Sequence, residues 1–443
     1  MHVTRRLTLQ IACSAVLVTA FAQAAFSANL CVNPAGSGGC YSTIQGAVSH
    51  AAPYDVINVG PGTYKEDVTI SHSLSLIGAG AGKTTIDATG LANGIFVDGY
   101  SHHDGISHVI VDGFTVKNAQ FEGILVVSAF DVTIRNNTIV DNDKFGPVFS
   151  PNPSGCLGQP AFETDESGDC GGGLHFIGVS GSVVSGNTMT GNADGILLSD
   201  ETAETHDNLL IHNIVKDNAL ECGVVLASHN PVGSTGPYFA PHLGVDHNTI
   251  EGNIVADNGV KVGGAGVGLF SDGNGPGGAY NNVISHNVLT GNGIGGVALH
   301  SHVGPSFGAP ADNMSGNTII GNYIAGNLAD TDDTATPGRV GININSGGGG
   351  TPIWNTIITG NIIRDEDVDI AINTPGTVNA HLNDLLGGKI GVANICAFDH
   401  ASCAGSIDVT QNYWGCSNPH ASGCSTTSGG SIVSSPALYA PVD

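Results

Sequence analysis

The chain has 443 residues, of which 66 are glycine and only 11% are charged, a composition that favours short strands joined by tight turns over long helices. Its 38 acidic residues exceed its 12 basic ones, giving a formal net charge of −26. Such a field repels polyanions, which excludes nucleic acid as a partner and means that a polyuronate would need a basic cleft or bound calcium.

The first residues have the pattern of an export signal. Arg5 and Arg6 precede an apolar run at 7–21, and small residues at 22–28 offer cleavage sites, so we assign residues 1–28 to a signal peptide. The two arginines also fit a twin-arginine signal, which leaves the export route open. No later stretch reaches the roughly 18 to 20 apolar residues that cross a bilayer. We therefore expect a secreted or periplasmic protein without a membrane span.

The cysteines of the exported part predict local disulfides. Eight of them form close-spaced couples, which bridge in an oxidising compartment. Cys222 is left over, and because it directly precedes the strand-opening Gly223 we expect a buried, inert thiol. The expected bridges join Cys31 to Cys40, Cys156 to Cys170, Cys396 to Cys403 and Cys416 to Cys424.

Residues 41–48 predict one short amphipathic helix, because apolar residues three and four apart follow a Ser/Thr N-cap. First strands are expected at 56–59, 68–70 and 74–77. A helix in this position would cap the core of whatever repeat follows it.

From about Asp112 to Asn412, pairs of asparagines five residues apart recur, usually followed by a glycine and a short apolar strand. A unit of roughly 22 residues or more cannot bury its own apolar face, so it must stack on its copies as a solenoid. We assign these asparagines to the scaffold, since asparagine tolerates the left-handed conformation at a bend and its amide can bond the asparagines of the coils above and below. The pairs are Asn137 and Asn142, Asn187 and Asn192, Asn213 and Asn218, Asn253 and Asn258, Asn287 and Asn292, and Asn322 and Asn327.

Two stretches carry a family resemblance. The segment 43–87, with Gly62-Thr63-Tyr64-Lys65-Glu66 at its centre, resembles the opening coils of the pectin lyase-like superfamily of right-handed parallel β-helices. Pectin methylesterases share this Gly-x-Tyr-x-Glu motif. The later coils resemble the repeats of NosD-type periplasmic proteins and of many bacterial polysaccharide lyases and hydrolases. The resemblance implies the fold strongly and the function weakly, because this architecture hosts several reactions and many non-enzymes.

The sequence thus predicts an all-β, single-domain right-handed parallel β-helix with a short N-terminal capping helix. We expect the cap and first coils at 29–90, the repeats at 91–415 and a closing segment at 416–443, with Trp414 covering the open end of the core. We expect a monomer.

Aligning the strands at their opening glycines predicts which side chains leave the core. Positions one and three after each glycine are apolar and should point inward, which turns positions four and six outward in columns about 4.8 Å apart. Position four gives Ser199, Ala227, Phe270 and His300, and position six gives Glu201, His229, Asp272 and His302.

These columns predict a polysaccharide site. Glu201 and Asp272, two coils apart with backbones about 9.6 Å apart, could serve as the general acid and base of an inverting glycosidase, with His229 tuning either pKa. Long loops beside the columns carry Tyr238, Phe239 and Phe307, which we expect to stack on sugars. The sequence therefore predicts binding of an extracellular glycan in a groove and leaves open whether bonds are broken and whether by hydrolysis or elimination.

Two other interpretations stay open. His300 and His302 share a strand face and, with Asp272 or His229, could bind zinc or copper in a NosD-like role. Alternatively, the repeat is a non-catalytic scaffold that supplies length. The motif sets of polygalacturonases, pectin methylesterases and pectate lyases are all incomplete in this chain, so no cofactor is required by the sequence.

Overall fold

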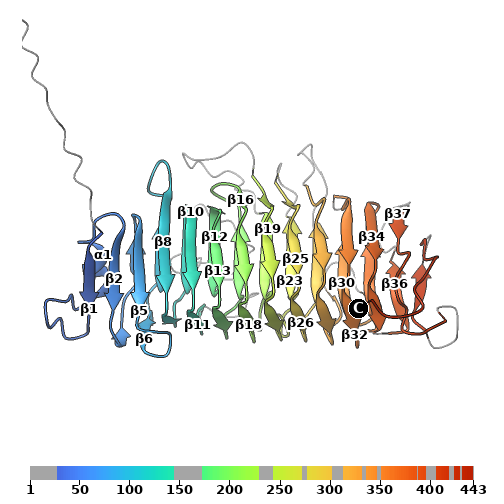
Figure 1. Ribbon diagram of the computed structural model, residues 1–443, viewed down its shortest axis with the longest axis horizontal. Helices are drawn as coiled ribbons and strands as arrows, with labels where there is room; N and C mark the ends of the chain where they lie inside the picture. Colours follow the sequence, from blue (N-terminus) through green and yellow to red (C-terminus); the bar gives the residue numbers. More distant parts are fainter. Residues whose placement is uncertain are drawn as a thin grey trace, which may run out of the picture.

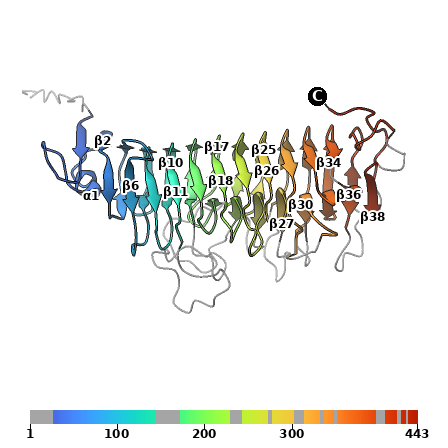
Figure 2. The same ribbon diagram turned by 90° about the horizontal axis from the view of Figure 1, so that it is seen from below.

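The computed structural model describes residues 27–143, 172–228, 243–271, 277–301, 313–331, 336–346, 351–386, 388–395, 406–418, 424–429 and 432–442. In these residues the chain forms a long stack of coils in which every named strand pairs in parallel with a strand of the next coil (Figure 1). Figure 2 shows the same stack with α1 near one end and β38 near the other. This is the predicted right-handed parallel β-helix.

The stack has three faces. The first face contains β4 (Val68–Ile70), β7 (Ile95–Asp98), the first part of β10 (Ile124–Arg135), β12 (Leu174–Ser180), β15 (Ile196–Ser199), β19 (Val224–Ser228), β23 (Val267–Ser271), β27 (Val297–Ser301), β30 (Val340–Asn345), β33 (Val368–Asn373), β36 (Ile390–Asn394) and β38 (Thr426–Gly429).

The second face continues from the first, and β10 bends through both. It contains the last part of β10 together with β1 (Asn29–Val32), β2 (Asp55–Val59), β5 (Leu74–Gly78), β8 (Ile106–Asp112), β13 (Val183–Ser185), β17 (Leu209–Ile211), β21 (Thr249–Glu251), β25 (Val283–Ser285), β28 (Thr318–Ile320), β31 (Thr356–Thr359), β34 (Thr377–His381) and β37 (Ser406–Asp408). Three short strands lie at the corner between the two faces: β16 (Thr205–His206), β20 (Val245–Asp246) and β24 (Ala279–Tyr280).

The third face is a separate parallel sheet of three- and four-residue strands. It contains β3 (Gly62–Tyr64), β6 (Thr84–Asp87), β9 (Thr115–Lys117), β11 (Thr138–Val140), β14 (Thr188–Thr190), β18 (Ile214–Lys216), β22 (Ile254–Ala256), β26 (Val288–Thr290), β29 (Tyr323–Ala325), β32 (Ile362–Arg364) and β35 (Asp384–Leu386).

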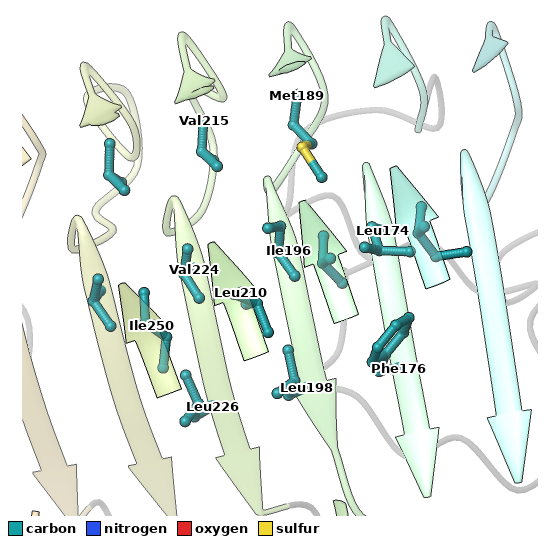
Figure 3. Close-up of a cluster of buried hydrophobic side chains, with 14 of the residues drawn as sticks. Leu174, Phe176, Met189, Ile196, Leu198, Leu210, Val215, Val224, Leu226 and Ile250 are labelled. Carbon is teal, nitrogen blue, oxygen red and sulfur yellow. The ribbon is translucent and has the colours of Figure 1, made fainter. Parts of the chain in front are cut away.

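Side chains from all three faces meet in one continuous core. Figure 3 shows Leu198 of the first face, Leu210 of the second and Met189 of the third pointing into the same interior. The predicted inward positions one and three are confirmed, because each of these side chains is at most 1% exposed: Ile196, Leu198, Val224, Leu226, Val267, Leu269, Val297 and Leu299.

The strand-opening glycines are required by close packing between coils. A Cβ atom on Gly195 would overlap the side chain of Val215 and the backbone carbonyl oxygen of Gly223 on the next coil. A Cβ atom on Gly223 would likewise overlap the carbonyl oxygen of Gly266, and one on Gly266 would overlap that of Gly296. Only glycine lets the corner backbones approach this closely.

The predicted helix is confirmed as α1 (Ile44–Val48), with Thr43 as its N-cap. Its first N–H groups are also capped from another coil, since the Glu66 carboxylate accepts from the backbone N–H of Ile44 at 2.9 Å and of Gln45 at 2.8 Å. The Gly-x-Tyr-x-Glu motif thus supports the cap of the core, and Glu66 has a structural role in this chain.

Stacked asparagines fix the register of the coils, as predicted. In a typical rung, Asn213 donates from Nδ2 to the Oδ1 of Asn253 at 3.0 Å and from its backbone N–H to the same oxygen at 2.8 Å. Asn253 in turn donates from its Nδ2 to the Oδ1 of Asn287, and the same Nδ2 also donates to the carbonyl of Leu210. The first ladder runs through Asn137, Asn187, Asn213, Asn253, Asn287, Asn322, Asn361, Asn383 and Asn412.

Two further ladders accompany the first. The second runs through Asn142, Asn192, Asn218, Asn258, Asn292 and Asn327 and ends on Glu366. The third, which the sequence analysis did not identify, runs through Asn208, Asn248, Asn282 and Asn317.

The left-handed residue at each bend is not the ladder asparagine but the residue before it. Asp207, His212 and Asp257, which precede ladder asparagines, have φ between 55° and 57°. This corrects the sequence-based expectation that asparagine itself takes the positive φ. The ladder asparagine instead keeps its side chain turned inward, where its amide can reach both neighbours.

The ends of the chain and the cysteines agree with prediction where they are described. Trp414 is 3% exposed and belongs to the main core, so it covers the end of the stack as expected. The bridges Cys31 to Cys40 and Cys416 to Cys424 are formed. Cys222 is buried, and its sulfur accepts from the backbone N–H of Ala265. The other two predicted bridges lie outside the described residues. Within the described part of the chain, no helix is long and apolar enough to cross a membrane.

Glu366 ends the second ladder with a carboxyl group where the other rungs have an amide. Its Oε1 accepts from the backbone N–H and the Nδ2 of Asn327, both at 2.9 Å, while its buried Oε2 has no hydrogen-bond partner. Burial raises the pKa of Glu366 to about 7 from an ordinary value of 4.5, because the charged form is poorly solvated there.

We predict that Glu366 makes stability pH-dependent. Because its pKa is raised on folding, its contribution is fully present below about pH 4.5 and is lost as the pH rises through about 7. Glu366→Gln should therefore gain about 2 to 3 kcal/mol of unfolding free energy over the wild type at pH 8 and little at pH 4.5. Urea denaturation at both pH values measures this, with Glu251→Gln as the control. Parallel pH curves for wild type and Glu366→Gln would contradict it.

Candidate functional site

The predicted outward column of the first face is in register. Ser199 of β15 pairs with Ala227 of β19, Ala227 with Phe270 of β23, and Phe270 with His300 of β27. The aromatic rings of Phe270 and His300 pack edge to face with centroids 5.5 Å apart. The alignment at strand-opening glycines therefore gave the correct neighbours.

This column is not an open edge. Ser199, Ala227 and His300 point outward as predicted, yet each is at most 2% exposed. The reason lies in the neighbouring outward column, where Leu197, Val225 and Ala298 form a second apolar cluster. A sheet with apolar side chains on both faces is stable only when both are covered.

The structure describes two of the eight predicted site residues. Glu201 lies in the turn after β15 and is fully buried. His300 is buried beside Asp330, with its Nε2 2.9 Å from Oδ2 of Asp330, and the same oxygen accepts from Asn343 at 2.6 Å. The other six lie outside the described residues: His229, Asp272, Tyr238, Phe239, His302 and Phe307.

The described residues do not supply a set of ligands for the predicted metal site. In them no group of three or more His, Cys, Asp or Glu side chains is arranged to hold a metal ion. The ligands proposed to join His300 belong to the residues that the structure does not describe, so the zinc or copper site stays a prediction.

The turn that carries Glu201 is anchored to the coils on both sides. On one side, Thr202 accepts from the hydroxyl of Ser128 at 3.1 Å and donates to the carbonyl of Ile177 at 3.3 Å. On the other side, Asp200 accepts from the hydroxyl of Ser228 at 2.8 Å. Residues 199–206 thus form a fixed polar rim at the end of the first face, and we refer to them as the rim turn.

At the end of the rim turn, Glu204 meets a second carboxyl group, Asp246. The corner strands β16, β20 and β24 place His206, Asp246 and Tyr280 side by side, and the hydroxyl of Tyr280 donates to Oε1 of Glu204 at 3.1 Å. Glu204 is partly exposed, whereas Asp246 is buried and contacts Nδ1 of His247 through its Oδ1. Glu204 and Asp246 are called the acid pair below.

The acid pair favours the protonated form of Glu204. The pKa of Glu204 is raised first by burial and then by the neighbouring Asp246. A hydrogen bond between two carboxyl groups needs one of them protonated, so closeness to Asp246 disfavours the state in which both are charged. The pKa of Tyr280 is raised as well, by burial and by the charges of Asp246 and Glu204, so its hydroxyl remains a donor. This arrangement can deliver a proton to a bound molecule from a partly exposed group.

A second hydrogen-bonded group starts from the other end of the rim turn. Oγ of Ser199 lies 2.7 Å from Nε2 of His175, and Nδ1 of His175 lies 3.0 Å from Oε1 of Glu122. All three side chains are at most 1% exposed.

Sequence reasoning missed these residues, although the chain carries signals for some of them. His206, Asp246 and Tyr280 each stand two residues before an asparagine of the third ladder, so an alignment on Asn208, Asn248 and Asn282 would have brought them together. His175 stands at position two after Gly173, a column that the alignment left out. Nothing in the spacing of the repeat points to Glu122.

A comparison with known protein families agrees with the fold. Residues 76–238 match the family model described as the right handed beta helix region. Similar solved structures include the A-module of the Azotobacter vinelandii mannuronan C-5 epimerase AlgE4, at 16% identity and a TM-score of 0.47, covering 79% of this chain and 92% of that chain. Pectate lyase Pel9A matches at 15% identity and a TM-score of 0.49, covering 81% and 80%.

The α-1,3-glucanase of Streptomyces thermodiastaticus matches at 13% identity and a TM-score of 0.44, covering 94% of this chain and 69% of that chain. No curated protein matches the sequence. With TM-scores below 0.5 and identities of 13 to 16%, these structural likenesses add nothing to what the strand pairing itself shows.

We predict that the acid pair is visible in the pH dependence of stability. Because the pKa of Glu204 is raised on folding, its contribution is present at acidic pH and is lost as the pH rises. Glu204→Gln should therefore lose less thermal stability than the wild type between pH 4 and pH 8. Glu251→Gln, which removes a carboxylate from β21, serves as the control. An equal loss in wild type and Glu204→Gln would show that the pair shares no proton.

Proposed function

Because the chain folds as a right-handed parallel β-helix of the pectin lyase-like type, we propose that it is an exported protein that binds an extracellular polysaccharide along the rim of its first face and hydrolyses it. The observation that carries the proposal is the acid pair, in which a partly exposed Glu204 accepts from the hydroxyl of Tyr280 and has its pKa raised by burial and by the neighbouring Asp246. Glu204 of this pair stands three residues after Glu201 in the rim turn.

Hydrolysis of a glycosidic bond needs a proton for the leaving oxygen and a second carboxylate on the other side of the sugar. Glu204 supplies the proton, since its raised pKa keeps it acidic but protonated to higher pH than an ordinary glutamic acid. The second carboxylate is Glu201 or Asp272, which takes a proton from the attacking water as the C–O bond breaks. His229 adjusts the pKa of that group in this proposal.

The net negative charge of the chain narrows the choice of substrate class. With 38 acidic and 12 basic residues, a polyuronate would be repelled unless calcium bridged it to the protein, so a neutral polysaccharide is the favoured substrate. Tyr238, Phe239 and Phe307 are proposed to stack on its sugar rings. The two disulfides at the ends of the described chain fit the oxidising conditions outside the cytoplasm.

The acid role of Glu204 predicts a defect in turnover rather than in binding. On a polysaccharide that the wild type degrades, Glu204→Gln should lower kcat at least about 100-fold and leave KM within a few-fold, because the amide cannot donate the proton to the leaving oxygen. Tyr280→Phe should show a smaller loss, since the acid pair remains. Reducing-end release measures kcat, and calorimetry measures binding.

Glu251→Gln again serves as the matched control and should keep wild-type turnover. Full activity in a correctly folded Glu204→Gln protein would rule out the acid pair as the proton donor. A scaffold without glycan chemistry predicts neither binding nor turnover for any of these proteins.

A further inference from the structure

The hydrogen-bonded row Glu122, His175 and Ser199 has the geometry of a nucleophile, a base and an acid. Nε2 of His175 is 2.7 Å from Oγ of Ser199, and its Nδ1 is 3.0 Å from Oε1 of Glu122. The second oxygen of Glu122 accepts from the backbone N–H of Gly172 at 2.9 Å, which fixes the carboxylate in place. Both ring nitrogens of the histidine are therefore engaged in the order that activates a serine hydroxyl.

One tautomer of His175 suits this chemistry. When Glu122 is a carboxylate it can only accept, so Nδ1 of His175 carries the hydrogen donated to it. Nε2 of the neutral ring then accepts from the hydroxyl of Ser199. This is the protonation state in which histidine can remove the serine proton, and the buried Glu122 charge stabilises the imidazolium that results.

The fold does not need polar residues at these positions. His175 lies in the outward column of the first face between Leu125 of β10 and Leu197 of β15, so leucine fills the same position on both neighbouring coils. Ser199 stands in its column between Ile177 and Ala227. Placing a histidine, a serine and a carboxylate among apolar neighbours costs solvation free energy that leucine and alanine avoid, and this calls for an explanation other than packing.

We propose that Ser199 is the nucleophile of an acyl-ester hydrolase site, with His175 as general base and Glu122 as the positioning residue. Oγ of Ser199 bonds to the ester carbonyl carbon, and its proton passes to Nε2 of His175. The ester C–O bond then breaks and the departing alcohol takes that proton. Water attacks the acyl-serine in the same way, so that ester and water give acid and alcohol.

The identity of the alcohol part of the ester rests on the proposed function, under which the ester is an acyl group on a hydroxyl of a glycan. The reaction at Ser199 does not depend on which alcohol is released. A deacylase at the rim turn, next to the acid pair, would remove acyl groups from the same polysaccharide chain whose bonds the acid pair cleaves. The three side chains are at most 1% exposed in this structure.

A fluorophosphonate probe tests the proposal on the folded full-length exported chain. We expect stoichiometric labelling, located on Ser199 by peptide mass spectrometry, together with hydrolysis of p-nitrophenyl acetate. Ser199→Ala should abolish both, and His175→Ala should lower the labelling rate at least about 100-fold. Ser228→Ala is the matched control, because Ser228 is equally buried on the next coil and bonds to Asp200 instead of a histidine.

The positioning role of Glu122 has its own readout. In Glu122→Gln the imidazolium loses its carboxylate, so the acid limb of the labelling pH profile should move to lower pH while the maximal rate falls. Labelling that is absent, or that persists in Ser199→Ala, in protein with native circular dichroism overturns the proposal. Glu204→Gln separates the two functions, since it should keep full labelling of Ser199. Esterase activity without any glycan turnover would refute the proposed function and still support Ser199 as the nucleophile.

Discussion

Hydrogen bonds between stacked asparagine amides are the interaction on which the rest of this structure depends. Every amide in the first ladder is buried, so its donors and acceptor have to be met within the protein. They are met by the asparagines of the adjacent coils and by backbone carbonyl groups. A slip by one residue would leave a buried amide without partners, at a cost of about 1 to 3 kcal/mol for each group. The ladders therefore fix the register of the coils.

The ladders also allow the coils to differ in length. Successive rungs of the first ladder are 50 residues apart at Asn137 and 22 apart at Asn361, yet the amide hydrogen bonds there are 3.1 and 2.9 Å long. The additional residues are placed between the rungs without disturbing the strands. A rigid corner next to a loop that can vary in length allows binding residues to be added without changing the scaffold. The rim turn lies in this position, between β15 and the third ladder.

The same logic explains which features the sequence predicted. The asparagine columns and the inward residues such as Ile196 and Leu198 follow from periodicity, and the structure confirms them. The outward direction of Ser199 and His300 follows from the period of the strand, but their burial does not, because burial there depends on what covers the sheet. The acid pair was missed because Glu204 and Asp246 come from corners of different coils, whose alignment needs the third ladder.

The central claim is that the rim of the first face hydrolyses a polysaccharide, and its product is the most direct test. The chain without residues 1–28 would be incubated with a panel of neutral and acidic polysaccharides, with and without calcium. The products would be assayed for reducing ends and for unsaturated, ultraviolet-absorbing ends. The account predicts new reducing ends from a neutral polysaccharide without unsaturation. Unsaturated products would mean elimination and contradict it, and the absence of product from every polysaccharide would favour a scaffold.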